Sequence, residues 1–190
     1  MKNKRVLVVL GGTSGEREVS LDSGRACAKA LKKKGYQVST FDPKKKNYNL
    51  IDKNKTDVIF NALHGKDGED GVAQSYFEYL KIPYTHSGVI SSYNAMDKII
   101  SKELFKKNKI KTPKYFTFKK INFNKVKLNT SIKKEKIKFP IVIKPKNEGS
   151  SIGVKICKNI LTLNIAAKFL FKKYKELIFE SYIGGQEIQV

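Results

Sequence analysis

The sequence lacks tryptophan, has few cysteines and contains no long apolar run. Cys27 and Cys157 stand far apart, without the spacing of a metal or redox pair. We expect both to act as small apolar residues, and nothing indicates an oxidising compartment. The first apolar run reaches glycine too early for a signal peptide and is too short to cross a bilayer. We therefore expect a cytoplasmic protein with no membrane partner.

Negative charge is also scarce. Asp and Glu number 17 against 39 Lys and Arg, a formal net charge of +22. Lysine carries almost all of it, since arginine occurs at Arg5, Arg17 and Arg25. A nucleic-acid binder is one explanation, but we find no arginine-rich arm, helix-turn-helix pattern or RNA-binding aromatic motif. Because lysine is spread along the chain, we interpret it as a solvated surface and expect no nucleic-acid partner. A non-catalytic basic module that binds nucleotide or nucleic acid is the alternative.

The first half of the chain alternates strand and helix patterns. Residues 4–10 form a continuous β-branched apolar run, typical of a buried parallel strand. Further strands are predicted at 36–41, 57–63 and 82–85, and helices at 19–34 and 72–80. We expect the first helix to carry Val19, Ala26, Ala30 and Leu31 near one face. The alternation predicts an open parallel α/β domain over residues 1–96.

The pattern changes at Asp97, where we expect a second domain over 97–190. Helices are predicted at 97–108 and 160–174, strands at 115–118, 141–144, 153–157 and 177–183, and a lysine- and asparagine-rich surface segment within 119–138. The order of these elements predicts an α+β unit with a mostly antiparallel sheet.

One loop of the second half carries an unusual set of residues. "PKNEGSSIG" (145–153) follows Lys144 at the end of a predicted strand. Glycines and serines here could turn several donors toward one point, and Lys144 adds a point charge, which together suit a phosphate. A decorated hairpin with a surface lysine is the plain alternative. The Walker pattern is absent.

Two glycine-rich loops follow strands of the first half, where an open sheet places its ligand crevice. "GGTSGEREVS" (11–20) contains Glu16, which could hold an ammonium group or cap the following helix. "ALHGKDGEDG" (62–71) begins near His64, which has either a structural or a binding role. The acidic residues of the second loop suit a turn better than a cation site.

Three further residues are candidates for contacts with a nucleotide. Lys98 lies near a predicted helix start, which disfavours a cation unless an anion is bound nearby. Glu180 and Glu187 flank "SYIGGQ" (181–186), where carboxylates could bind an adenine amino group or ribose hydroxyls, or simply face solvent.

Together, these stretches resemble the D-alanine–D-alanine ligases of the ATP-grasp superfamily. The resemblance is carried, in family order, by "LGGTSGEREVSLDSG" (10–24), "ALHGKDGEDG" (62–71), "PYTHSGVISSYNAMDK" (83–98), "IVIKPKNEGSSIGV" (141–154) and "FESYIGGQE" (179–187). It implies a pre-ATP-grasp domain followed by the first half of an ATP-grasp fold.

The resemblance also implies a reaction. Such ligases transfer the γ-phosphoryl group of ATP to the carboxylate of one D-alanine, and the amine of a second D-alanine attacks the acyl phosphate. D-Alanyl-D-alanine, which feeds peptidoglycan synthesis, leaves with ADP and phosphate.

The resemblance assigns a role to each candidate residue. Glu16 and His64 would line the first D-alanine subsite, and Ser150 would couple the loop to Glu16 by a hydrogen bond. The residues expected to bind ATP are Lys98, Lys144, Gly149, Ser150, Ser151, Glu180, Ile183 and Glu187.

The sequence stops at Val190, where the family's third domain would begin. That domain is expected to carry the Mg²⁺ ligands and the second D-alanine subsite, so we expect a truncated, catalytically incompetent ligase that binds ATP weakly. A homodimer is possible by resemblance. A D-alanine–D-lactate, D-alanine–D-serine or other ATP-grasp ligase fragment is the near alternative, since residues that choose the second substrate would lie largely in the missing part.

Overall fold

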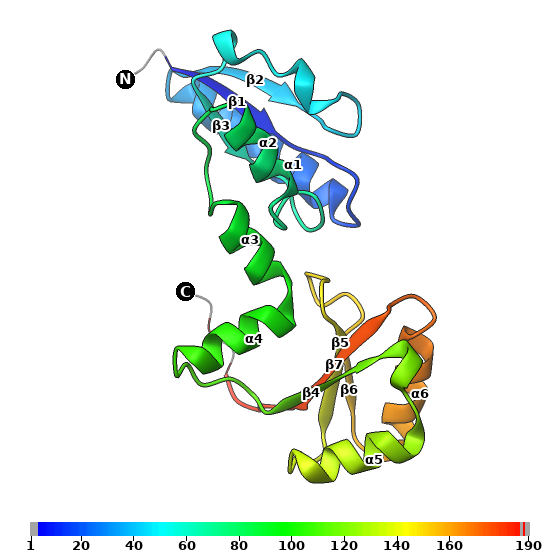
Figure 1. Cartoon of the computed structure of the whole chain (residues 1–190). Helices are drawn as coiled ribbons and strands as arrows, with labels where there is room; N and C mark the ends of the chain where they lie inside the picture. The colour runs from blue at the N-terminus through cyan, green and yellow to red at the C-terminus, as the bar shows by residue number, and fades with distance from the viewer. Residues whose placement is uncertain (1–3, 187, 189–190) are drawn as a thin grey trace. The chain divides into compact units, whose positions relative to one another are not determined.

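The computed structural model describes residues 4–186 and 188 of the chain. These residues form two compact units, Met1–Met96 and Asp97–Val190, each with its own sheet (Figure 1). Glu187, expected to bind ribose, lies outside the described residues.

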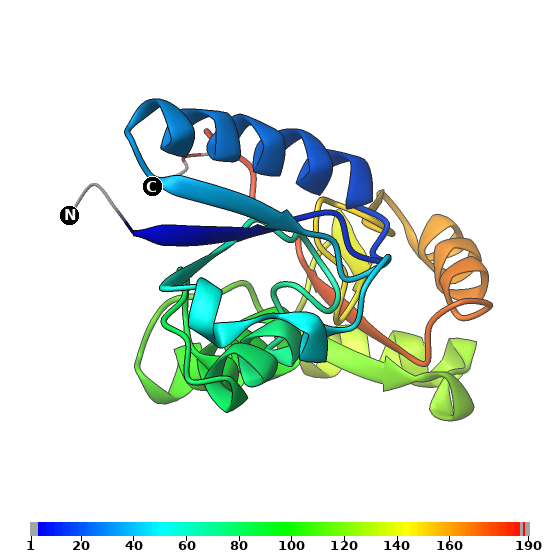
Figure 2. The ribbon, with the colours of Figure 1, turned by 90° about the horizontal axis from the view of Figure 1, so that it is seen from above.

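The first unit is built on a parallel sheet with strand order β2-β1-β3. The strands are β1 (Arg5–Val9), β2 (Gln37–Phe41) and β3 (Val58–Asn61). Helix α1 (Arg17–Lys33) covers one face, where Val6 and Val8 are buried, and runs beside β1 and β2 in Figure 2. Helix α2 (Val72–Tyr79) packs on the other face against Leu7 and Val9. This arrangement confirms the expected parallel α/β fold.

Helix α1 packs through small side chains. Its buried residues are Ser20, Gly24 and Ala28, while Val19 is 56% exposed. A Cβ atom on Gly24 would lie 2.5 Å from Leu10 Cβ, so the helix and the strand end approach each other closely. Of the four residues expected near one face of the helix, Leu31 packs partly buried against the cluster that contains Val6 and Val8. Val19, Ala26 and Ala30 are exposed.

Three short elements of the first unit were not predicted. The chain makes 3₁₀ turns at η1 (Tyr48–Leu50) and η2 (Lys53–Lys55), and helix α3 (Val89–Met96) follows α2. The predicted strand at 82–85 is instead an isolated bridge between Ile59 and Tyr84.

The second unit is built on an antiparallel sheet with strand order β4-β7-β5-β6, as expected. Its strands are β4 (Tyr115–Lys119), β5 (Ile141–Pro145), β6 (Lys155–Cys157) and β7 (Glu176–Ser181). One face carries Ile143 and Phe179 into a core that helix α6 (Ile160–Leu170) closes. Because side chains alternate along a strand, Lys144 and Glu180 belong to the opposite face.

Two more helices complete this unit. Helix α4 (Lys98–Lys107) places Lys102 against Glu180. Helix α5 (Lys125–Lys134) lies in the lysine-rich stretch predicted only as a surface segment. Asn124 caps α5 by accepting a hydrogen bond from the Lys127 N–H, and Leu128 anchors it in the core.

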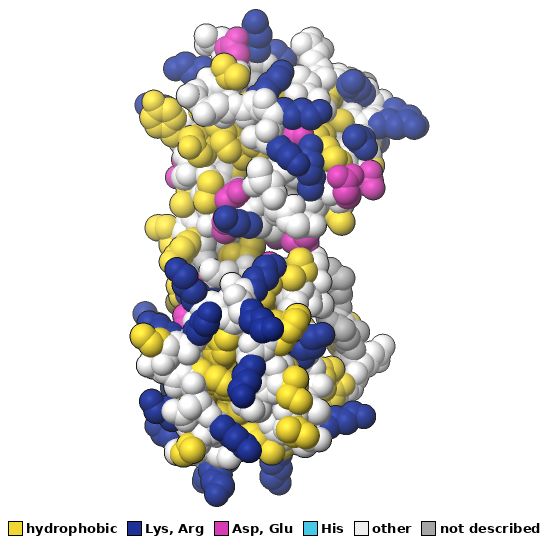
Figure 3. Space-filling model, turned by 90° about the vertical axis from the view of Figure 1, so that its right-hand side faces the viewer, with side chains coloured by type: hydrophobic (Ala, Val, Ile, Leu, Met, Phe, Trp, Pro, Cys, Tyr) yellow, Lys and Arg dark blue, Asp and Glu magenta, His cyan; other side chains and the backbone are white. Residues whose placement is uncertain are grey.

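Basic side chains are spread over the surface. On the face shown in Figure 3, lysine and arginine side chains are scattered rather than gathered in one patch.

Within residues 4–186 and 188, no helix combines the length and the apolar character needed to cross a bilayer.

Candidate functional site

The loop between β5 and β6 holds strained backbone. The N–H of Ile152 donates to the carbonyl oxygen of Gly149 at 2.9 Å, which closes a turn across Ser150 (φ 44°) and Ser151 (φ 58°). Positive φ costs about 1–2 kcal/mol for a residue with a Cβ. Left-handed serines in an exposed loop are the kind of strain that accompanies functional sites.

Glycine matters in this loop mainly at Gly153. Gly153 has φ 75°, and a Cβ atom there would lie 2.8 Å from Pro145 Cγ. The sequence led us to expect that glycines supply the special backbone angles, but Ser150 and Ser151 adopt two of them. The hydroxyl-bearing residues therefore lie at the tip of the turn.

Below the loop, one buried carboxylate lies between two lysines. Glu180 on β7 is 6% exposed; its Oε2 lies 2.8 Å from Lys102 Nζ, and its Oε1 contacts Lys144 Nζ. The structure thus brings together Lys144 and Glu180, which the sequence singled out separately.

Lys98 adds a third ammonium group to this cluster. Its Nζ donates to the carbonyl oxygen of Glu148 in the loop. Burial lowers the pKa of Lys98 below its ordinary value, and the positive charge of Lys144 lowers it further. The chain therefore brings Lys98, Lys102 and Lys144 near Glu180, with Glu148 and Asp97 also acting on Lys98. Several ammonium groups beside one loop suit an anionic ligand.

The start of α4 is fixed to the end of β5. Asp97 accepts hydrogen bonds from the N–H groups of Ile99 and Ile100, and Lys146 Nζ lies 2.9 Å from its Oδ2. Burial raises the pKa of Asp97, but Lys146 and the two N–H donors outweigh this effect, so the pKa lies below its ordinary value. Lys98 also donates its backbone N–H to the Lys146 carbonyl at 3.0 Å. These bonds hold the Lys98 backbone beside Lys144.

The two glycine-rich loops of the first unit meet at the ends of β1 and β3. Ser14 Oγ donates to the His64 carbonyl at 2.7 Å, and a Cβ atom on Gly65 would lie 2.5 Å from Glu16 Oε2. His64 Nε2 lies 3.1 Å from Ser23 Oγ, and its Nδ1 lies 3.5 Å from Glu69 Oε1. Glu16 occupies the N-cap position of α1, yet its side chain makes no capping hydrogen bond. At this position the Glu16 carboxylate faces the positive end of the helix dipole.

The remaining candidate residues lie in the β5–β6 loop and in the segment after β7. Gly149, Ser150 and Ser151 belong to the β5–β6 loop, and Ile183 follows β7 with 68% of its surface exposed. The hydrogen bond that we expect between Ser150 and Glu16 joins the two units and stays a prediction.

Lys102 was missed by the sequence reasoning. It lies four residues after Lys98, so both occupy one side of α4. That spacing, on the helix that begins at Asp97, is the signal that could have found it.

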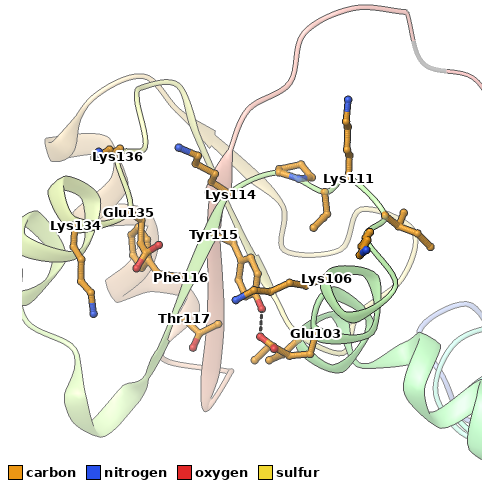
Figure 4. Close-up of a pocket in the computed structure, with 15 residues that line it drawn as sticks. Glu103, Lys106, Lys111, Lys114, Tyr115, Phe116, Thr117, Lys134, Glu135 and Lys136 are labelled. Carbon is orange, nitrogen blue, oxygen red and sulfur yellow. Dashed lines mark hydrogen bonds between the residues drawn. The ribbon is translucent and has the colours of Figure 1, made fainter.

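A hollow lies elsewhere in the second unit. It has a volume of about 850 Å³ and lies between α4, the 109–114 loop, β4 and the end of α5 (Figure 4). Tyr115 donates its hydroxyl proton to Glu103 in this hollow, and Lys106, Lys111 and Lys114 line it. The candidate residues proposed from the sequence do not line it. Because β4 is an edge strand, we interpret these lysines as protection against edge-to-edge pairing.

Within the part of the chain that the structure describes, no group of three or more His, Cys, Asp and Glu side chains could hold a metal ion. We therefore assign no Mg²⁺ ligand to these residues.

The chain matches two family models. Residues 40–87 match the model described as "D-ala D-ala ligase N-terminus", and residues 104–190 match "D-ala D-ala ligase C-terminus". The D-alanine–D-alanine ligase of Pelagibacter ubique is 51% identical over 189 residues, covering 98% of this chain and 60% of that protein.

Solved structures show the same relationship. The D-alanine–D-alanine ligase of Bacillus anthracis superposes with a TM-score of 0.83 at 36% identity, covering 96% of this chain and 58% of that one. Its complex with ATP gives 0.79 at 33% identity, covering 96% and 60%. The VanG D-Ala:D-Ser ligase of Enterococcus faecalis gives 0.79 at 28% identity, covering 96% and 64%.

The chain spans about 60% of the length of the curated relatives that it matches. With two matching family models, a relative at 51% identity and the same fold, the chain belongs to the D-alanine–D-alanine ligase family.

Proposed function

We propose that the protein acts in the ATP-dependent ligation of two D-alanines. The observation that carries this proposal is the cluster of Lys98, Lys144 and Glu180 beneath the serine-bearing loop, in a chain of this family. In the reaction, a carboxylate oxygen of the first D-alanine takes the γ-phosphoryl group and ADP leaves. The neutral amine of the second D-alanine then attacks the acyl carbon, and collapse of the tetrahedral intermediate releases phosphate and one proton with the dipeptide.

The residues of this chain would contribute positioning and charge. Lys98 and Lys144 neutralise nucleotide phosphates, because phosphoryl transfer depends on compensating the charge of the moving group. The loop with Gly149, Ser150 and Ser151 closes over those phosphates and excludes water.

The other end of the nucleotide meets β7 and the residues after it. The Glu180 carboxylate accepts a hydrogen bond from the adenine amino group. The Ile183 backbone meets the ring edge, and Glu187 binds ribose.

Glu16 and His64 belong to the first D-alanine subsite in this proposal. The Glu16 carboxylate suits the ammonium group of that substrate, since opposite charges attract at close range. Ser150 couples the loop to Glu16. Mg²⁺ on the ATP phosphates, a homodimer, a cytoplasmic location and a product used for peptidoglycan synthesis are further parts of the same proposal.

Nucleotide binding is the measurement that tests these roles in the 190 residues, since the relatives are longer. We expect the chain to bind ADP in calorimetric titrations, and K144M to weaken binding by about tenfold or more, because a charge-assisted hydrogen bond to phosphate is lost. K168M is the matched control, because Lys168 is exposed on α6. Equal affinity of the wild type and K144M would contradict the phosphate role.

The second substrate needs its own assay. VanG, which shares the fold, is a D-Ala:D-Ser ligase. D-Alanine-dependent phosphate release, repeated with D-serine or D-lactate beside D-alanine, separates these specificities. The proposal is rejected if D-alanine never stimulates phosphate release in a protein that contains this chain and the remaining length of its relatives.

A further inference from the structure

Lys102 is a lysine that the proposed reaction does not use. It is 5% exposed, and its Nζ lies 2.8 Å from Glu180 Oε2. It also donates to Thr112 Oγ1 at 2.8 Å and to the carbonyl oxygen of Pro113 at 3.3 Å. An ammonium group has three protons, so these three oxygens can engage all of them, and the Tyr115 ring centroid lies 4.8 Å from Nζ. Lys102 therefore has no donor left for a ligand.

Lys144 has a different environment. Its Nζ contacts the other oxygen of Glu180, Oε1, and its side chain is 20% exposed, against 7% for Lys102. Both lysines thus share one carboxylate, but Lys144 is the one that solvent and ligands can reach.

The cluster carries more positive charge than Glu180 can balance. Two ammonium groups contact this one carboxylate. Lys98 is close enough for the charge of Lys144 to lower its pKa, while Glu148 and Asp97 raise it. Unbalanced charge in a buried place is unfavourable unless a counter-ion arrives. The same surplus makes Lys144 available to an anion, provided that Glu180 keeps another cation.

We propose that Lys102 is a positioning residue that keeps Glu180 neutralised, so that Lys144 can leave Glu180 and bind a phosphate group of the nucleotide. This inference rests on the proposed function. When Lys144 moves, Glu180 Oε1 becomes an open acceptor, as the proposed contact with the adenine amino group requires. Without Lys102, Lys144 is the remaining contact cation of Glu180 among the described residues, and its release leaves a buried carboxylate unpaired.

The first test uses inorganic tripolyphosphate, a probe with neither adenine nor ribose. We expect K102M to weaken its binding by about tenfold, because Glu180 then retains Lys144. The double variant K102M/E180Q should regain at least wild-type affinity, since a neutral amide does not hold Lys144. A merely structural role of Lys102 predicts no such rescue, so a double variant as weak as K102M overturns the proposal.

The matched control is K106M, on the next turn of α4, where Lys106 is exposed. It removes one positive charge from the same helix, so general electrostatic attraction would weaken it as much as K102M. We expect K106M to bind within about twofold of the wild type. Loss in both variants alike would assign the effect to net charge and overturn the positioning role.

A second measurement separates this inference from the proposed function. Lysine ammonium signals are followed by ¹⁵N NMR and assigned with K102R and K144R. Without ligand, we expect the Lys144 ammonium protons to exchange with water faster than those of Lys102, and to slow in K102M. On titration with ADP, the Lys144 signal should shift and the Lys102 signal should not.

The possible outcomes of the NMR experiment distinguish the proposed phosphate role from the positioning role of Lys102. If neither ADP nor tripolyphosphate binds, the proposed phosphate role of Lys98 and Lys144 in these 190 residues fails, while the ligand-free exchange rates still decide the role of Lys102. Unchanged Lys144 exchange in K102M, or an ADP-induced shift at Lys102 instead of Lys144, overturns the inference. Should K102M not fold, the comparison of Lys102 with Lys144 in the wild type decides it.

Discussion

At the scale of single residues, one ion pair organises the loop after β1. Arg17 contacts both oxygens of Asp42, at 2.7 and 3.1 Å, and donates to the Gly12 carbonyl at 2.7 Å. Asp42 Oδ1 also accepts the Gly12 N–H at 3.1 Å. The loop that carries Glu16 is therefore fixed by a carboxylate at the end of β2.

This ion pair gives stability a defined dependence on pH. Hydrogen bonds from Arg17 lower the pKa of Asp42 from its ordinary value near 3.8 to about 2. A lowered folded-state pKa stabilises the fold above the ordinary value, and the stabilisation is lost as pH falls through about 2. We expect D42N to lower the free energy of unfolding of the first unit by about 2 kcal/mol at pH 7, and the difference to vanish near pH 2.

Urea unfolding of both proteins between pH 7 and pH 2 measures this effect. D22N is the control, because the Asp22 side chain is 81% exposed and lies 3.6 Å from Arg25. An exposed pair of this kind contributes at most about 1 kcal/mol. A deficit of D42N that persists unchanged to pH 2 would show that charge is not the cause.

The sequence allowed us to identify individual candidate residues, but not which of their side chains contact one another. Lys144 and Glu180 were both identified from motifs, whereas their shared contact depends on antiparallel register, which places Val142 opposite Glu180. Lys102 and Asp42 were missed because each acts through a partner far away in the sequence.

At the scale of elements, α1 shows how packing overrides helix propensity. Gly24 lies within the helix, where alanine would be more favourable by about 1 kcal/mol. A Cβ atom there would lie 2.5 Å from the Cβ of Leu10, an atom that cannot move without the strand end. We expect overpacking to outweigh propensity, so that G24A destabilises the first unit by about 1–3 kcal/mol.

A double-variant cycle with L10A tests the cause. Removing the Leu10 side chain beyond Cβ relieves the contacts at its Cδ2 and Cγ but not the clash with Cβ itself. In the L10A background, G24A should therefore destabilise the first unit less than it does in the wild type, but the destabilisation should not disappear. If G24A raises the melting temperature, propensity dominates and the close approach is not limiting.

The same comparison shows which elements the sequence could predict. A continuous β-branched run predicted β1, because such runs are typical of buried strands. The strands β3 and β5 were also predicted, at 57–63 and 141–144. Helix α5 was not recognised, because among its lysines and asparagines Leu128 is buried and Ile132 is only partly buried against the core. The expected strand at 82–85 makes one bridge, since strand formation depends on how far a neighbour extends and not on local pattern alone.

At the scale of the whole molecule, the two units have separate hydrophobic cores. The core of the second unit contains residues between Phe118 and Phe179, while the two clusters of the first unit contain residues between Val6 and Tyr84. Units of this size with their own cores can fold independently. Thermal unfolding should therefore show two transitions that respond to different substitutions.

Leu177 tests this independence. It is fully buried in the second core, and a Leu→Ala change at such a site costs about 2–5 kcal/mol through lost contacts and a cavity. L177A should lower the melting temperature of one transition by several degrees or more, while D42N lowers the other. Calorimetry of the wild type and of both variants measures each transition. If L177A and D42N shift a single common transition, the two units unfold as one cooperative body and are not independent.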